Sequence, residues 1–415
     1  MLKVEFKKIF KRGDANLLTQ VLNVTAFKIV LVTLQPMKFQ NEAILSLGSN
    51  QGDRQQHIEA CINHIHNHIA TVVRVSGLYE TPSWGFESDD FYNCAIMVHT
   101  HKSAKVLLDE ILKAEIEAGR IRTEEEGYSA RSIDIDIIAF NNQIISETDL
   151  IVPHPRMQDR NFVLYPLKDV GPGWEHPVLK KDIDALIAQS PDDSNCKLVL
   201  QLNNPISDIA FSGVNYMAVE GNIGAGKTSL AGRIAEDFNA KIVLERFADN
   251  PFLPKFYKEP ARYAFSLEMS FLADRHQQLS DDMSQLDLFS DFVVSDYHIF
   301  KSLIFAKVTL TEDEYRLYQK LFDIINKETP KPDLYIYLYR KTDALLQQIK
   351  QRGRSYEQDI QPDYLNKLNS GYMEYIRLQK DLNILVIDVD GLDFVNNQQD
   401  YLTVLNTIKQ HTLAD

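Results

Sequence analysis

Gly221-Asn222-Ile223-Gly224-Ala225-Gly226-Lys227-Thr228 is the stretch that decides the fold of the C-terminal half. It matches G-x-x-x-x-G-K-[ST], and it stands between an apolar segment at 216–220 and a helical pattern, the context that this motif requires. Glycines let main-chain N–H groups turn toward phosphates, and the N-terminus of the next helix adds positive potential. We predict that these eight residues bind ATP, that Lys227 bridges its terminal phosphates and that Thr228 is a ligand of Mg²⁺.

Short apolar segments on either side of this loop predict the architecture. After the loop's own strand they lie at 241–244, 292–295, 334–338 and 384–387, separated by long helical segments. This spacing is typical of an α/β fold with a parallel sheet covered by helices on both faces. Before residue 189, the apolar runs 72–75, 95–98 and 133–140 mix with an amphipathic stretch at 104–118, which predicts an α+β domain.

Polar and proline residues at 189–195, with a weaker break at 203–205, mark the boundary between the two patterns. We predict an extension at 1–36, a first domain at 37–200, a linker at 201–213 and a second domain at 214–415. We interpret the extension as dispensable, with a misassigned start upstream of Met37 as one explanation and a targeting segment as the alternative. Two enzymes in one chain is the natural hypothesis.

Composition and charge argue against several classes of function and location. The 415 residues carry 44 basic and 58 acidic side chains, a net charge of −14, which argues against a non-specific grip on nucleic acid. The apolar run at 25–34 is too short to span a bilayer, so we expect no membrane association. Cys61, Cys94 and Cys196 are too few and too far apart for a disulfide framework, which favours the cytoplasm.

Residues downstream of the loop indicate its substrate. Glu245 follows the second predicted strand, Tyr257 lies in Phe256-Tyr257-Lys258, and the pair Arg352 and Arg354 lies near the C-terminus. Together with the loop they resemble the deoxynucleoside kinase family from residue 216 to about 410. The resemblance implies that Glu245 takes the proton from the sugar 5′-hydroxyl and that Tyr257 binds the 3′-hydroxyl. It also implies that the two arginines, which stay charged and fork onto phosphate oxygens, close over the transferring phosphoryl group.

The same resemblance assigns further residues. It implies that Glu357 is a second sugar contact, that Asp390 belongs to a loop around the adenine of ATP, and that Asp296 serves Mg²⁺. It also implies a homodimer through the helices of this domain. Taken singly, each of these residues has an ordinary structural explanation.

Two positions depart from the family pattern. Tyr297 stands where an arginine normally steadies the phosphate, and we expect Arg246 or the arginine pair to compensate, or turnover to be lower. Glu268 stands where a glutamine normally reads the base, whereas Arg275 keeps its family position. An ionised glutamate only accepts hydrogen bonds, so it suits guanine, which offers two adjacent donors. We predict that deoxyguanosine is preferred and deoxyadenosine is next, unless Arg275 pairs with Glu268 and turns it away from the base.

The chemical centre of the N-terminal half is Arg131-Ser132-Ile133-Asp134-Ile135-Asp136-Ile137. Residues two apart in a strand face the same side, so both carboxylates point into one site. Adjacent carboxylates repel each other unless cations lie between them, and Mg²⁺ is the cation that we predict for Asp134 and Asp136. Alternation on an edge strand is the structural alternative.

Four separated blocks make residues 37–200 resemble 6-hydroxymethyl-7,8-dihydropterin pyrophosphokinase, an enzyme of the folate pathway with a ferredoxin-like α+β fold. The blocks are Leu47-Gly48-Ser49-Asn50, Tyr79-Glu80-Thr81-Pro82 with Phe91-Tyr92-Asn93, the aspartate segment, and Val152-Pro153-His154-Pro155-Arg156 with Arg160-Asn161-Phe162. The resemblance implies a pterin site formed by Thr81, Pro82, Phe91, Asn93, Tyr128 and Phe162. It implies an ATP site formed by Glu115, Arg122, Ile137, His154 and Arg160, with Arg120 and Arg131 as catalytic cations.

One departure weakens ATP recruitment in this half. Many members of the family have Arg-Trp-Gly-Pro-Arg before the aspartates, whereas this chain has Glu125-Glu126-Gly127-Tyr128-Ser129-Ala130-Arg131. We therefore expect a bifunctional ATP-dependent transferase that acts on small molecules, namely a pterin alcohol and a deoxynucleoside. The alternatives are that one half, more readily the kinase half, is a binding or dimerisation module, or that this half phosphorylates nucleoside monophosphates.

Overall fold

A computed structural model describes residues 38–83, 89–118, 131–246, 250–284 and 290–414. The chain from Gln40 onward forms one compact unit that contains every element discussed below. Within the described ranges, helices long and apolar enough to cross a membrane are absent.

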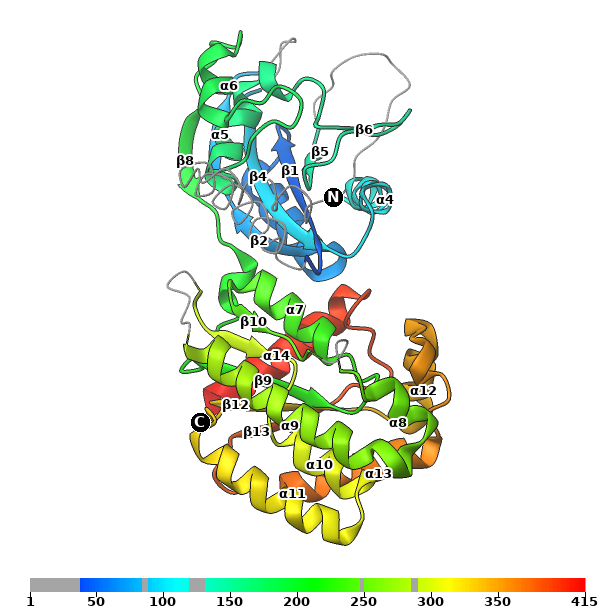
Figure 1. Ribbon diagram of the computed structural model, residues 1–415. Helices are drawn as coiled ribbons and strands as arrows, with labels where there is room; N and C mark the ends of the chain where they lie inside the picture. The colour runs from blue at the N-terminus through cyan, green and yellow to red at the C-terminus, as the bar shows by residue number, and fades with distance from the viewer. Residues whose placement is uncertain (1–37, 84–88, 119–130, 247–249, 285–289, 415) are drawn as a thin grey trace, which may run out of the picture. The chain divides into compact units, whose positions relative to one another are not determined.

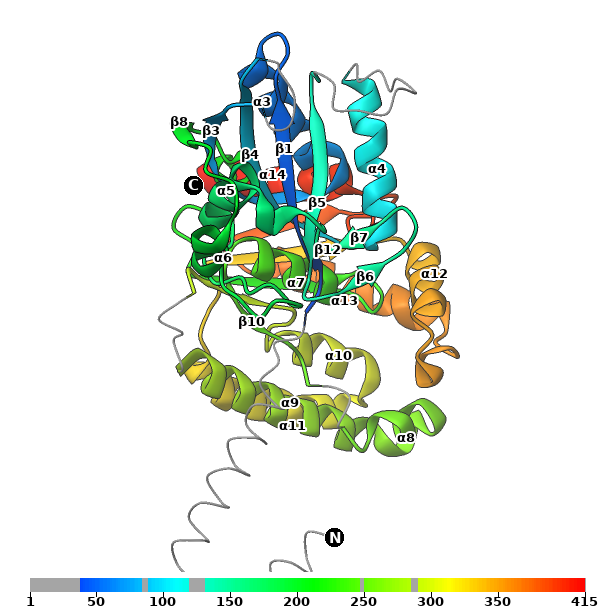
Figure 2. The same ribbon diagram turned by 90° about the horizontal axis from the view of Figure 1, so that it is seen from above.

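The N-terminal half is built on an antiparallel sheet with the strand order β5-β1-β4-β3-β8, and β2 also pairs with β4. Figure 2 shows β8, β3, β4, β1 and β5 side by side in this order. The strands are β1 (Asn41–Ser49), β2 (Thr71–Val75), β3 (Gly77–Thr81), β4 (Phe91–Thr100), β5 (Asp134–Phe140) and β8 (Lys197–Gln201), and a separate hairpin consists of β6 (Ile145–Ser146) and β7 (Ile151–Val152).

Helices cover both faces of this sheet because its strands bury side chains on both sides. Leu45, Leu47 and Ile96 belong to the core under α3 (Arg54–His64), η1 (Ile65–Ile69) and α4 (Ala104–Glu117). Ile44 and Met97 belong to the opposite core, under α5 (Asn161–Val170) and α6 (Ile183–Gln189). The short turn η2 (Met157–Asp159) precedes α5. The predicted α+β domain is confirmed.

The C-terminal half contains a parallel sheet with the strand order β10-β11-β9-β12-β13. Its strands are β9 (Tyr216–Gly221), β10 (Lys241–Val243), β11 (Val293–Ser295), β12 (Leu334–Tyr339) and β13 (Ile384–Asp388). All five were expected from the apolar segments. The turn η3 (Pro205–Asp208) precedes β9.

Side chains of the central strands alternate between two cores. Met217, Val219 and Ile336 lie with α7 (Lys227–Asp237), α12 (Thr342–Arg352) and α14 (Gln398–Ala414). Tyr216 and Tyr335 belong to the core on the other face, whose covering helices are seen in Figure 1. That face carries α9 (Pro260–Ser284), α10 (Lys301–Thr309), α11 (Glu312–Ile325) and α13 (Pro362–Leu378), and the remaining elements are α8 (Leu253–Lys258), η4 (Asn326–Glu328) and η5 (Ser355–Glu357). A parallel sheet buried on both faces is the predicted α/β fold.

Candidate functional site

The phosphate-binding loop runs from the end of β9 into α7. Gly224 and Gly226 have φ angles of +83° and +95°, which side chains with a Cβ rarely adopt, so the glycines of the motif are required by the backbone. The Lys227 ammonium donates a 2.9 Å hydrogen bond to the carbonyl of Asn222 within the same loop. Burial, and then the nearby charge of Lys301, lower the pKa of Lys227 to about 8. The lysine is thus held inside the loop, where a phosphate chain would lie.

Asp296 connects the loop to the second strand. Its Oδ2 accepts a hydrogen bond from the Thr228 hydroxyl, and its Oδ1 accepts a 2.7 Å bond from the main-chain N–H of Glu245. A hydroxyl and a carboxylate side by side at the start of α7 are oxygen donors that suit Mg²⁺. The residues present therefore fit the predicted metal, and Asp296 also fixes the position of Glu245.

Glu245 is held by two buried cations. Arg275 donates to Oε1 from Nε at 2.8 Å and from a terminal nitrogen at 2.6 Å, and the Lys301 ammonium lies 2.6 Å from Oε2. Burial alone would raise the pKa of Glu245, but Lys301 and Arg275 outweigh it and hold the pKa well below the usual range. Glu245 is therefore ionised and able to accept a hydrogen bond from an alcohol.

The predicted arginine pair and sugar contacts lie together on another side of the cavity. Arg352 and Arg354 both form ion pairs with the buried Glu357, the second at 3.2 Å. The ring of Tyr257 stacks on Tyr356, with 6.0 Å between their centroids. Glu357 thus positions both arginines.

Glu268 lies deeper in α9 and is 2 % exposed. Its Oε1 accepts a 3.0 Å hydrogen bond from the Thr309 hydroxyl, while Oε2 has no partner among the described residues. Burial raises the pKa of Glu268 to about 7, although Arg275 opposes the shift. The hydrogen bonds of Arg275 go to Glu245 and to Ser302, so the alternative in which Arg275 pairs with Glu268 is not the arrangement in this structure.

One cavity collects most of the predicted residues of this half. Its lining includes Lys227, Thr228, Glu245, Tyr257, Glu268, Arg275, Asp296, Arg352, Arg354 and Glu357. Asp390 is not part of this lining and pairs with Lys341 at 2.9 Å. Lys301, which also lines the cavity, and Thr309 were not expected from the sequence. The position of Lys301 inside the apolar run 299–305 is the signal that could have indicated it.

The first departure from the family pattern has a structural explanation. Tyr297 is fully buried in the core of the sheet face that carries α9 to α11. The side chain of Arg246, by contrast, is 66 % exposed, and its guanidinium lies 3.9 Å from Asp282. Arg246 therefore does not take the place of the missing arginine in this structure.

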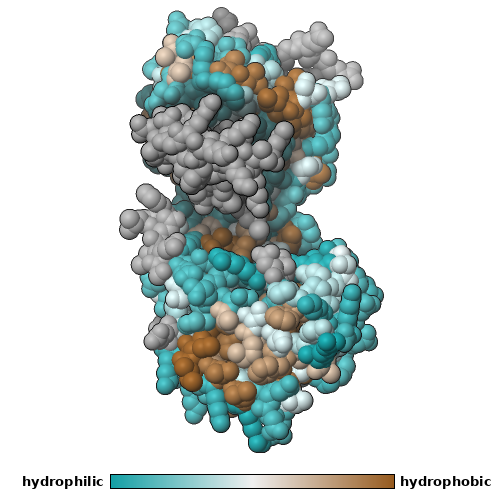
Figure 3. Space-filling view, in the orientation of Figure 1, coloured by the Kyte–Doolittle hydropathy of each residue, from teal (hydrophilic) through white to brown (hydrophobic). Residues whose placement is uncertain are grey.

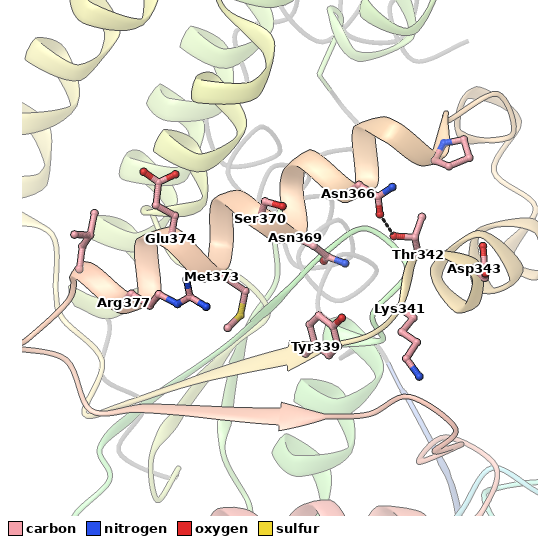
Figure 4. Close-up of a pocket in the computed structure, with 12 residues that line it drawn as sticks. Tyr339, Lys341, Thr342, Asp343, Asn366, Asn369, Ser370, Met373, Glu374 and Arg377 are labelled. Atoms are coloured by element: carbon pink, nitrogen blue, oxygen red, sulfur yellow. Dashed lines mark hydrogen bonds between the residues drawn. The ribbon is translucent and has the colours of Figure 1, made fainter.

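A second, larger cavity of about 990 Å³ lies between α13, the end of β12 and the start of α12 (Figure 4). It contains none of the predicted site residues. Asn369 on its wall accepts a 2.8 Å hydrogen bond from the side chain of Asn222, and Asn366 bonds Thr342 (Figure 4). This cavity therefore reaches the back of the phosphate-binding loop and not the site of chemistry.

In the N-terminal half, Asp134 and Asp136 lie on one side of β5 while Ile135 and Ile137 are buried in the core. The Arg131 guanidinium lies 2.6 Å from Asp134. Burial and the charge of Asp134 raise the pKa of Asp136 to about 6. A carboxylate whose ionisation is opposed by burial and by a neighbouring carboxylate fits a site for a divalent cation.

The predicted pterin residues include a buried pair. The Asn93 amide donates a 2.8 Å hydrogen bond to the Thr81 hydroxyl, and both side chains are buried. A Cβ at Gly48 would lie 3.0 Å from Oδ1 of Asn93, so the glycine makes room for the amide. Phe91 and Phe162 are partly buried, and Pro82 is exposed.

The predicted ATP residues differ in what they can offer. Burial and the charge of Arg160 lower the pKa of His154 to about 4, so this imidazole is neutral. The buried Arg160 guanidinium lies 5.5 Å from the ring centre of Phe162. Glu115 accepts a 2.9 Å bond from the N–H of Ile135, which ties α4 to the strand of the aspartates. The Ile137 side chain packs in the core. The predicted residues Arg120, Arg122 and Tyr128 lie outside the described residues.

Comparison with known proteins gives two separate matches. Residues 44–172 match the family model described as 7,8-dihydro-6-hydroxymethylpterin-pyrophosphokinase, and residues 217–413 match the one described as deoxynucleoside kinase. A pyrophosphokinase of Bacillus subtilis is 41 % identical over 132 residues, 31 % of this chain and 78 % of that protein. The deoxyguanosine kinase of B. subtilis is 37 % identical over 199 residues, 47 % of this chain and 96 % of that protein. The deoxyadenosine kinase of Dictyostelium discoideum is 33 % identical over 191 residues, 44 % of this chain and 75 % of that protein.

Proposed function

Because the chain belongs both to the hydroxymethyldihydropterin pyrophosphokinase family and to the deoxynucleoside kinase family, we propose that it catalyses two ATP-dependent transfers. The first domain transfers a pyrophosphoryl group to 6-hydroxymethyl-7,8-dihydropterin. The second transfers a γ-phosphoryl group to the 5′-hydroxyl of a deoxynucleoside. We assign residues 37–200 to the first domain, 201–213 to a linker and 214–415 to the second.

The observation that carries the kinase assignment is the cavity that Glu245 shares with the phosphate-loop Lys227. In the proposed reaction the 5′-hydroxyl gives its proton to Glu245 while its oxygen bonds to the γ-phosphorus. The bond from that phosphorus to the β,γ-bridging oxygen breaks, and ADP leaves. Lys227, Arg352 and Arg354 stabilise the charge on the phosphoryl oxygens, which is the main catalytic requirement of this reaction. Mg²⁺, held by Thr228 and Asp296, would supply further charge neutralisation on the phosphates.

Selection of the nucleoside rests on the other walls of the cavity. Tyr257 and Glu357 bind the deoxyribose, and Glu268 faces the base edge. The names of the B. subtilis and D. discoideum relatives, one a deoxyguanosine and one a deoxyadenosine kinase, support a purine. The loop containing Asp390 binds the adenine of ATP.

The alternation of Asp134 and Asp136 on β5 carries the assignment of the first domain. In the proposed reaction the pterin hydroxymethyl oxygen bonds to the β-phosphorus of ATP, the bond to the α,β-bridging oxygen breaks, and AMP leaves with the proton of the alcohol passing to solvent. Asn93 and Thr81 orient the pterin ring, because an amide both donates and accepts hydrogen bonds along its edge. Arg131, Arg160 and the neutral His154 contact the ATP phosphates or base, and Mg²⁺ at the two aspartates would neutralise the phosphate charge.

We further propose a homodimer through the second domain. Figure 3 shows hydrophobic residues gathered on the face where α9 and α11 lie in Figure 1. Leu317 and Ile324 of α11 are 51 % and 66 % exposed, and a partner that packs on this face would cover them. We place the enzyme in the cytoplasm because Cys61 and Cys94 are buried free thiols.

Product analysis tests both assignments at once. The full chain is supplied with ATP, Mg²⁺ and either the pterin alcohol or one of the four deoxynucleosides. AMP with the pterin reports pyrophosphoryl transfer, and ADP with a deoxynucleoside reports phosphorylation. Absence of ADP with every deoxynucleoside, together with ADP formation from a 5′-monophosphate, contradicts the nucleoside kinase assignment.

A further inference from the structure

Helix α10 places a lysine at the point where the acceptor hydroxyl and the phosphoryl group must meet. Lys301 is the first residue of this helix, its side chain is 8 % exposed, and its ammonium lies 2.6 Å from Oε2 of Glu245. The same side chain lines the cavity with Lys227 and Asp296. Lysine is seldom buried unless it is paired, and the partner of Lys301 is Glu245, the expected base of the kinase reaction.

The two residues that follow Asp296 provide no charge at this place. Tyr297 lies in the hydrophobic core. His298 is 1 % exposed and is not part of the cavity lining. The main chain of His298 donates to Glu220, and its Nε2 lies 3.2 Å from the carbonyl of Pro330. The cation normally found just after the third strand is therefore missing from that segment.

The three arginines of the cavity are paired with carboxylates, and the Lys227 ammonium bonds the carbonyl of Asn222. Arg275 donates to Glu245 and, at 2.7 Å, to the Ser302 hydroxyl. Arg352 and Arg354 pair with Glu357. Lys301 uses one donor on Glu245, and its ammonium also lies 5.4 Å from the ring centre of Phe305, but no further hydrogen bond of this ammonium is found among the described residues. An ammonium has three donors, so two remain for a ligand in the cavity.

We propose that Lys301 is a catalytic lysine of the kinase domain, whose ammonium bridges Glu245 and the phosphoryl group in transfer. This inference rests on the proposed kinase function. It assigns to Lys301 the phosphate-steadying role of the arginine that Tyr297 replaces, for which Arg246 or the arginine pair was expected to compensate. The lysine reaches the site from the following helix and not from the strand end.

Proton transfer to Glu245 explains why this arrangement favours the transition state. Before the reaction, the charge of Lys301 is balanced by the ionised Glu245. As the 5′-hydroxyl gives its proton to Glu245, the carboxylate becomes neutral and the ammonium loses its counter-ion. The oxygen–phosphorus bond forms and ADP departs at the same stage, so the charge of Lys301 is available to the phosphoryl oxygens when they need it. Lys301 itself neither gains nor loses a proton. An interaction that strengthens during the reaction raises kcat more than it lowers KM.

Replacement of Lys301 by methionine, glutamine and arginine tests the proposal in the full chain. We expect Lys301→Met and Lys301→Gln to lower kcat for deoxynucleoside phosphorylation by roughly 100-fold, the effect of removing one such stabilising donor. The KM for the deoxynucleoside should change by less than about threefold, because ground-state binding does not depend on the released charge. Lys301→Arg keeps the charge and should restore at least a tenth of the wild-type kcat. Single-turnover measurements confirm that the loss is in the chemical step.

Lys307→Met is the matched control, because this lysine lies on the same helix but is 51 % exposed and pairs with Glu374. It should leave kcat and KM unchanged. Thermal unfolding checks each variant, and if Lys301→Met does not fold, Lys301→Gln decides the question because it retains a donor to Glu245. A folded neutral variant with kcat within threefold of wild type overturns the role of Lys301 and leaves the kinase assignment intact. Absence of ADP formation by the wild-type chain with every deoxynucleoside overturns the proposed function instead, and this proposal with it.

Discussion

The side-chain amide of Asn222 donates a 2.8 Å hydrogen bond to Oδ1 of Asn369, which joins the phosphate-binding loop to helix α13. A second bond of 2.9 Å goes from the same amide to the carbonyl of Leu365. Asn369 is fixed in turn by the carbonyl of Arg340 and the hydroxyl of Tyr337. The loop is therefore anchored from behind by residues that do not line the catalytic cavity.

This anchor predicts the effect of Asn369→Ala. Loss of one buried hydrogen bond worth about 1 kcal/mol should let the loop relax and raise the KM for ATP about fivefold to tenfold, with a smaller change in kcat. Asn366→Ala is the control, because Asn366 bonds Thr342 and has no contact with the loop. Steady-state kinetics at varied ATP concentration measures both variants. An equal rise in KM for the two would show that the loop does not depend on Asn369.

The aspartate pair predicts that the two activities separate. Asp134→Ala or Asp136→Ala should abolish AMP formation with the pterin alcohol and leave deoxynucleoside phosphorylation within about twofold, because effects at distant sites are largely independent. Asp149→Ala replaces an exposed carboxylate of the same half and should preserve both reactions. Chromatographic separation of AMP and ADP measures the outcome. If the kinase activity collapses in a folded Asp134→Ala variant, the assignment of separate sites is wrong.

Gly226→Ala tests the backbone of the loop. An added Cβ would lie 2.5 Å from Cζ of Phe394, and φ is +95°, so the substitution is both crowded and strained. We expect a loss of about 1–3 kcal/mol in the free energy of unfolding of this half and no measurable phosphorylation of deoxynucleosides. Gly173→Ala is a suitable comparison, because nothing lies within 4 Å of its added Cβ. Denaturant unfolding and ADP formation check the prediction, and an active, equally stable Gly226→Ala would refute it.

Local pattern was sufficient for much of this molecule. The five apolar segments of the C-terminal half became the five parallel strands, because a strand buried on both faces must be apolar throughout. The alternation at 133–140 placed Asp134 and Asp136 on one side, since successive side chains of a strand point to opposite faces. The loop at 221–228 was identified by its glycine, lysine and threonine motif between a predicted strand and a predicted helix, and both elements are present.

Contacts between segments that are distant in the chain could not be predicted from the sequence. Lys301 and Arg275 meet at Glu245 from two different helices, and no periodicity says which side chains of those helices converge. Thr309 reaches Glu268 in the same way. The ionisation of Glu268 also depends on burial that only the packed structure reveals.

The pKa of Glu268, raised to about 7 by burial, changes the prediction for base preference. Below that pH the side chain is protonated, so it offers one donor and one acceptor, as glutamine does, and this matches the edge of adenine. Above it, the ionised carboxylate accepts from the two adjacent donors of guanine. Arg275 and Lys301 favour the ionised form, whereas Glu245 and burial oppose it. The ratio of kcat/KM for deoxyguanosine to that for deoxyadenosine should therefore rise with pH, by about tenfold between pH 6 and pH 8 if one hydrogen bond is exchanged.

Two variants test this pH dependence. Glu268→Gln should favour deoxyadenosine at every pH and abolish the pH dependence of the ratio. Thr309→Val removes the donor to Oε1 of Glu268, so the ionised form loses a hydrogen bond and the pH at the midpoint of the change should shift upward. A ratio that is flat from pH 6 to pH 8 and unchanged in Glu268→Gln would remove Glu268 as the residue that reads the base.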